Sequence, residues 1–184
     1  MGRSAIHEAA SRLAQTLTDM GIPFAIAGAL AANAHGHVRT TGDVDVLLTP
    51  EGLAAFKARW LGRGWVEVFP GSRGLKDAVC DVRIDVLLTG DHPGDGKPKP
   101  VAFPDPAAAS EPDADGVPIL TLRTLIELKV ASGMTAPHRP RDLDDVIQLV
   151  RVNGLDREYA DGLDPYVRQR FEQLWEAAQV DEEY

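Results

Sequence analysis

"GDVDVLLT", residues 42–49, is the stretch that decides how this chain folds. Two acids alternate with apolar residues and then give way to an apolar run, a pattern that indicates a strand buried on one face. In a strand, Asp43 and Asp45 point to the same side, with their β-carbons about 6–7 Å apart. Two carboxylates this close disfavour each other's charge, so we expect something positive between them. A metal ion, a basic side chain and water are the alternatives.

A second stretch, "CDVRIDVLL" at residues 80–88, repeats the arrangement. Asp81, Arg83 and Asp85 share one face of the expected strand, and apolar residues share the other. If the two strands are neighbours, Asp43, Asp45 and Asp85 converge. A carboxylate cluster completed by substrate phosphates is a usual Mg²⁺ site, and two such ions can promote an in-line displacement at phosphorus. The alternative is a half-exposed sheet whose outer face is merely acidic.

Composition limits the classes of protein that this chain can belong to. The 184 residues carry a net charge of −9, which argues against broad, non-specific nucleic-acid binding but leaves room for a local basic cleft. No apolar stretch approaches the roughly 20 residues of a membrane span, and the first residues lack a signal peptide's apolar core. We therefore expect a cytoplasmic protein with no membrane partner. Cys80 is the single cysteine, so there is no internal disulfide and no cysteine zinc site.

Hydrophobic periodicity and helix-end signals divide the chain into alternating elements. We expect helices at residues 4–20, 29–36, 50–64, 122–134, 141–153 and 164–179, and strands at 22–28, 43–49, 65–69, 80–90 and 117–120. Residues 90–118 are rich in proline and glycine and form either a functional loop or a low-complexity linker. This order favours an α+β or α/β sheet domain followed by a C-terminal helical bundle.

The stretch "AGALAANAHGHVRTTGDVDVLL", residues 27–48, places a glycine between a strand and a helix and then returns into the acidic strand. It resembles the nucleotidyltransferase superfamily built on the DNA polymerase β palm, in which such a glycine is followed by Asp-x-Asp and later by one more acid on a strand. Gly28, Asp43, Asp45 and Asp85 stand at those positions. "RTTGDVDV" and "LIELKVASGMTAPHRPRDLDDVIQLV" look like the AbiEii-type toxins of type IV toxin–antitoxin systems. The resemblance covers roughly residues 20–150.

The resemblance implies an α+β fold, with a nucleotidyltransferase-type mixed β-sheet, flanking helices and a C-terminal helical bundle. Residues 1–120 would form the sheet domain, and residues 121–184 a helical region packed on it. It also implies that Asp43 and Asp45 hold metal, with Asp85 as third ligand and possible base. The cofactor would be Mg²⁺ or Mn²⁺.

A nucleotide-binding set follows from the same resemblance. It comprises Gly28, Ala29, Arg39, Thr40, Lys129, Arg139, Arg141 and Asp142. Lys129 would face the cleft and neutralise a triphosphate, so that its removal would impair the chemistry and leave stability nearly unchanged; the alternative is a surface lysine. Arg139, Arg141 and Asp142 either contact the nucleotide or acceptor, or cap and form ion pairs at the start of a helix. Asp142 would be favourable there, because a helix N-terminus attracts negative charge.

Three further polar residues are expected to take no part in the chemistry. Asp145 is interpreted as an acid on a helix surface. His35 and His37 are spaced as metal ligands can be, but we interpret them as solvated residues at a helix end.

The implied function is metal-dependent transfer of a nucleoside monophosphate from an NTP to an acceptor, with release of pyrophosphate. The acceptor could be RNA such as a tRNA, a protein or a small molecule. An alternative is a non-catalytic nucleotide- or partner-binding module, favoured by Ala29 and Arg141, which stand where the family usually has Gly or Ser and Lys. A third possibility is the toxin component of a type IV toxin–antitoxin-like pair, with a cognate antitoxin protein as partner.

Overall fold

The structure, a computed structural model, describes residues 4–180 and divides into two compact units. The first unit comprises the chain up to Ala31, together with Arg39–Thr89 and Pro104–Leu120. The second comprises Ala32–Val38, Gly90–Phe103 and the chain from Thr121 onward. The second unit thus combines the chain from Thr121 onward with two earlier segments.

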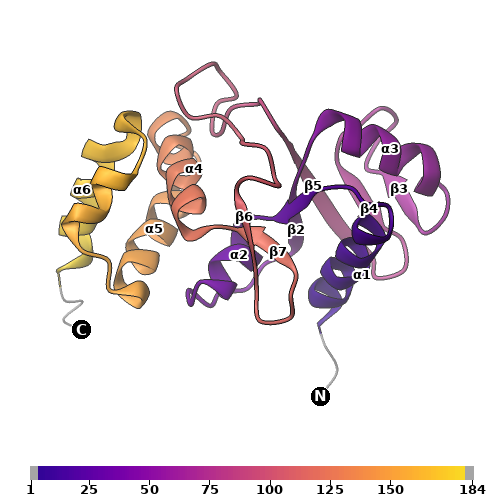
Figure 1. Cartoon of the computed structure of the whole chain (residues 1–184), viewed down its shortest axis with the longest axis horizontal. Helices are drawn as coiled ribbons and strands as arrows, with labels where there is room; N and C mark the ends of the chain where they lie inside the picture. The colour runs from indigo at the N-terminus through magenta and orange to yellow at the C-terminus, as the bar shows by residue number, and fades with distance from the viewer. Residues whose placement is uncertain (1–3, 181–184) are drawn as a thin grey trace. The chain divides into compact units, whose positions relative to one another are not determined.

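A seven-stranded mixed sheet, in the order β3-β4-β5-β2-β1-β7-β6, belongs to the first unit (Figure 1). β2 pairs in parallel with β5 and β1 pairs in parallel with β7, while the other neighbours are antiparallel. The strands are β1 Phe24–Ile26, β2 Asp43–Leu48, β3 Trp65–Glu67, β4 Leu75–Asp77, β5 Val82–Leu88, β6 Ser110–Pro112 and β7 Pro118–Leu120. The predicted α+β class is confirmed. β4 and β6 were not expected from the sequence.

In the first half of β2 and β5, one face of the sheet is apolar and covered, and the other carries the polar side chains. Val44, Val46 and Ile84 are fully buried or nearly so, whereas the acids between them are only half-buried. Helix α1 lies against β1, β2 and β5, and Phe56 of α3 meets the ring of Trp65 edge-on at 5.4 Å. Because the covered face takes the apolar side chains, the acids of β2 and β5 are left on the opposite face, called here the open face.

The helices begin and end where local chemistry predicts. They are α1 Ala5–Asp19, α2 Gly28–Ala34, α3 Pro50–Trp60, α4 Leu122–Thr135, α5 Pro140–Asn153 and α6 Pro165–Ala178. The Ser4 hydroxyl caps α1 and accepts from the amide of His7, while Thr49 caps α3 ahead of Pro50. Gly21 follows α1 with φ at +64°, a left-handed conformation that glycine adopts most readily.

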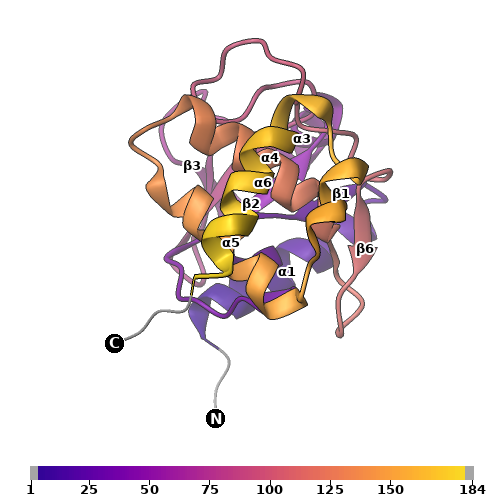
Figure 2. The ribbon, with the colours of Figure 1, turned by 90° about the vertical axis from the view of Figure 1, so that its left-hand side faces the viewer.

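In the second unit, α4, α5 and α6 pack against one another, and both Figure 1 and Figure 2 show them side by side. Val167, Phe171, Leu174 and Ala178 form the buried stripe of α6 at helical spacing. The predicted C-terminal helical bundle is therefore confirmed. A short 3-10 helix at Arg157–Gly162 was not expected. Within residues 4–180, no helix combines the length and apolar character needed to cross a membrane.

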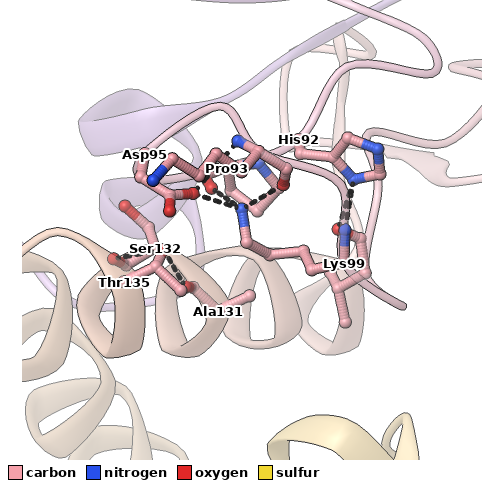
Figure 3. A network of polar contacts seen from close by, with 9 residues as sticks. His92, Pro93, Asp95, Lys99, Ala131, Ser132 and Thr135 are labelled. Carbon is pink, nitrogen blue, oxygen red and sulfur yellow. Dashed lines mark hydrogen bonds and ion pairs between the residues drawn. The ribbon is translucent and has the colours of Figure 1, made fainter.

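Residues 90–103 form a closed loop rather than a linker (Figure 3). Gly90 donates its amide to the carbonyl of Phe103 at 2.9 Å, and Phe103 donates back to Asp91 at 2.8 Å. The ammonium of Lys99, whose side chain is 5% exposed, donates to the carboxylate of Asp95 and to the carbonyls of Pro93 and Lys97. Figure 3 shows this loop against Ser132 and Thr135 of α4, and a Cβ added at Gly94 would meet both residues, so the loop packs closely on the helix.

Candidate active site

The candidate active site is the aspartate cluster, defined as Asp43, Asp45 and Asp85 on the open face of the first unit. In the parallel pair β2–β5, Asp45 stands directly opposite Asp85, and Asp43 stands directly opposite Arg83. Neighbouring strands lie about 4.8 Å apart, so side chains opposite each other on one face are within reach. The two strands are thus neighbours, as the sequence analysis required for the three carboxylates to converge.

Arg83 supplies the positive charge that we expected near Asp43 and Asp45. Its Nε donates to Asp85 Oδ1 at 2.6 Å, and the side chain is 59% exposed. The hydrogen bond to Asp85 raises the pKa of the Arg83 guanidinium, and the charges of Asp85, Asp43 and Asp45 raise it further. A basic side chain thus lies among the carboxylates.

Two local features hold the carboxylates of β2. The hydroxyl of Thr41 donates to Asp43 Oδ1 at 2.7 Å. Asp45 lies directly against the backbone of Gly28, which has φ at +57°. A Cβ added at Gly28 would come within 2.6 Å of Asp45 Cγ and closer still to Oδ2. Glycine is therefore required at this position both by its left-handed backbone and by the carboxylate beside it.

The aspartate cluster fits a hard divalent cation in its chemistry. Carboxylate oxygens are the ligands that Mg²⁺ and Mn²⁺ prefer, and the strand register brings three of them to one face. Among residues 4–180, however, no group of three His, Cys, Asp or Glu side chains is arranged to hold a metal ion. Arg83 already occupies Oδ1 of Asp85, so the guanidinium would compete with a cation for this carboxylate.

In the second unit, Lys129 is buried in a network of ion pairs. Its side chain is 7% exposed, and its ammonium lies 2.5 Å from Asp145 Oδ2 and 3.3 Å from Asp142 Oδ1. Ser132 donates its hydroxyl to Asp142 Oδ2 at 2.6 Å. The interpretation of Asp145 as a surface acid is wrong, because α4 and α5 pack together over it and leave its side chain 2% exposed. Lys129 is likewise not a surface lysine.

His37 joins the same network from the end of α2. Its Nε2 lies 3.1 Å from Asp145 Oδ1, and its side chain is 15% exposed. The interpretation of His37 as a solvated loop residue is therefore wrong. The sequence carried no signal for this contact, because His37 and Asp145 are 108 positions apart and meet only through tertiary packing.

The remaining predicted residues are distributed over both units. In the first, Ala29 is buried in α2, while Arg39 is half-buried and Thr40 exposed ahead of β2. In the second, Arg139 and Arg141 are both exposed at the start of α5. The structure thus brings Gly28 to the aspartate cluster, and Asp142 to Lys129.

Comparison with solved structures supports the fold. The chain resembles the solution structure of the antibiotic-resistance factor ANT(2″)-Ia, an aminoglycoside nucleotidyltransferase, with a TM-score of 0.57, 15% identity and 92% coverage of both chains. It resembles the crystal structure of ANT(2″)-Ia in complex with adenylyl-2″-tobramycin with a TM-score of 0.53 and 14% identity, covering 94% of this chain and 99% of that one. The fold is thus that of a nucleotidyltransferase. No family model and no curated protein sequence matches the chain.

Replacing Gly28 by alanine tests the packing beside Asp45. We expect Gly28→Ala to lower the free energy of unfolding by about 1–2 kcal/mol through the left-handed backbone alone, and by more because Asp45 must move. Chemical denaturation measures the change. Gly21→Ala is the matched control, since Gly21 has φ at +64° and open space around its Cα. Equal losses in the two variants would contradict a specific contact with Asp45.

Removing Lys129 tests the buried network. We expect Lys129→Ala to lower the free energy of unfolding by about 3–5 kcal/mol, because the ammonium no longer offsets the charge of the buried Asp145. This replaces the sequence-based expectation of nearly unchanged stability. Lys97→Ala, at an exposed lysine of the same unit, is the control and should have little effect. Equal stability of both variants would show that Lys129 is not needed to balance Asp145.

Proposed function

We propose that this protein is a metal-dependent nucleotidyltransferase that moves a nucleoside monophosphate from an NTP to an acceptor hydroxyl and releases pyrophosphate. The observation that supports it most is the register of β2 and β5, which sets Asp45 opposite Asp85 on the open face with Asp43 two residues away. The nucleotidyltransferase fold agrees with this chemistry, since the likeness extends over more than nine-tenths of the chain.

In the proposed reaction, the acceptor oxygen forms a bond to the α-phosphorus, and the bond from that phosphorus to the bridging oxygen of pyrophosphate breaks. Asp43 and Asp45 would hold Mg²⁺ or Mn²⁺, which when bound polarises the phosphate and stabilises the leaving group. Asp85, released by Arg83, would take the proton of the acceptor hydroxyl. Thr41 keeps Asp43 oriented, and Gly28 keeps the backbone close to Asp45.

The nucleotide contacts in the proposal follow the sequence prediction. Ala29, Arg39, Thr40, Arg139 and Arg141 remain predicted contacts, together with Lys129 and Asp142. The Lys129 ammonium is paired with the carboxylates of Asp142 and Asp145. To contact a triphosphate, it must leave at least one of these two carboxylates. The likeness to AbiEii-type toxins and the antitoxin partner also remain predictions.

A non-catalytic nucleotide-binding module is the second candidate. The ion pair between Arg83 and Asp85 favours it, since a permanent pair would keep Asp85 from serving as ligand or base. Pyrophosphate release separates the two candidates, because a binding module retains NTP and releases none.

Thermal unfolding tests the metal–nucleotide site. We expect Mg²⁺ with NTP to raise the melting temperature, because a ligand bound only by the folded state stabilises it. The double variant Asp43→Asn/Asp45→Asn should lose this rise and any pyrophosphate release. The control variant Asp144→Asn/Asp161→Asn removes two charges from exposed acids and should keep both. A double variant at 43 and 45 that responds like the parent protein would show that these acids are only a solvated face.

A further inference from the structure

Next to the aspartate cluster, the open face of the sheet carries two cations in register. Lys76 of β4 stands opposite Arg83 of β5, and Arg83 stands opposite Asp43 of β2. We call Lys76 and Arg83 the cationic row. With strands about 4.8 Å apart, the row begins one strand from Asp43 and extends about 10 Å from it. On the edge strand β3, Val66 continues the row opposite Lys76 and is 42% exposed.

Along the sheet, the cationic row lies on the β4 side of the aspartate cluster, and this side is the more exposed one. Toward β1, the space beside Asp45 is taken by the backbone of Gly28, where not even a Cβ fits. Toward β4, the side chains of Arg83 and Lys76 are 59% and 42% exposed. A molecule that approaches Asp85 along the sheet from this side therefore meets the two cations first.

Both cations are paired with acids that they can exchange. Lys76 lies 2.5 Å from Asp81, whose side chain is 84% exposed, and Arg83 pairs with Asp85, which is 33% exposed. Exposed ion pairs contribute little to stability, so a doubly charged phosphate can replace either carboxylate. A guanidinium also binds phosphate through two parallel hydrogen bonds, which makes the exchange favourable.

The charge of the surrounding chain agrees with an anionic ligand. Residues 57–83 hold six Lys and Arg against three Asp and Glu, whereas the whole chain has 19 against 28. On the open face, Lys76 and Arg83 are the members of this segment that stand in register with the aspartate cluster.

Resting on the proposed function, we propose that the acceptor carries a phosphate group close to its reacting hydroxyl, and that Lys76 and Arg83 bind that phosphate. The hydroxyl then lies toward Asp85 and the phosphate toward β4. A nucleic-acid strand end and a small phosphorylated compound both have this chemistry. A longer acceptor would continue over Val66 to the edge of the sheet.

Binding of a fluorescent single-stranded oligoribonucleotide, followed by anisotropy with Mg²⁺ at fixed ionic strength, tests the proposal. We expect the double variant Lys76→Gln/Arg83→Gln to weaken probe binding by about tenfold or more, equivalent to about 1.4 kcal/mol per factor of ten. The matched control Arg59→Gln/Arg63→Gln removes two exposed cations, one on α3 on the covered face and one in the following turn, and should stay within about twofold of the parent. Melting temperatures without ligand check that every variant folds.

Competition then identifies the source of the phosphate. Displacement of the probe by AMP as effectively as by unlabelled oligoribonucleotide assigns a small phosphorylated acceptor, and displacement only by the oligoribonucleotide assigns a strand end. Equal weakening in the two double variants overturns the proposal, as does a parent protein that binds tobramycin and not the probe. Because the response to Mg²⁺ with NTP is measured separately on the parent protein, failure of the nucleotidyltransferase proposal is distinguished from failure of the cationic row.

Discussion

The parallel pairing of β2 with β5 is the constraint on which the candidate site depends. It sets the direction of both strands, so that their polar residues fall on one face and their apolar residues on the other. A shift of one residue in this register would turn one strand's acids toward the covered face, where burying them is costly. The apolar residues Val44, Val46 and Ile84 thus fix the position of the carboxylates as firmly as any contact that the carboxylates make themselves.

The chain balances its aspartates in two different ways. On the open face, the guanidinium of Arg83 and the carboxylate of Asp85 remain in contact with water, so their pairing can be exchanged at low cost. In the second unit, Lys129 and Asp145 are both almost fully buried, so separating this ion pair is costly in a medium of low polarity. Exchangeable charge suits a site that must admit a substrate, whereas the buried pair acts as a structural element of the helical bundle.

Local pattern was sufficient to predict most of the fold. Alternation identified β2 and β5, and Ser4 and Pro50 marked the starts of α1 and α3. The missed strands β4 and β6 have the sequences LKD and SEP, in which no run of apolar residues marks a strand. The equally short β1, β3 and β7 were found because each contains such residues in sequence. Gly28 and the aspartates could be singled out because their chemistry is local to short motifs. The burial of Asp145 and its contact with His37 could not, since both are created by packing between distant segments.

The division into units has a consequence for how the protein can be assembled and dissected. The chain passes from one unit to the other at 31–32, 38–39, 89–90, 103–104 and 120–121, so neither unit is a single stretch of polypeptide. A fragment that begins at residue 121 would lack His37 and the loop at residues 90–103. During synthesis, 108 further residues must be added after His37 before its partner Asp145 is made. Contacts between residues so far apart in sequence also form slowly. The second unit is therefore completed late in biosynthesis, although its first residues are made early.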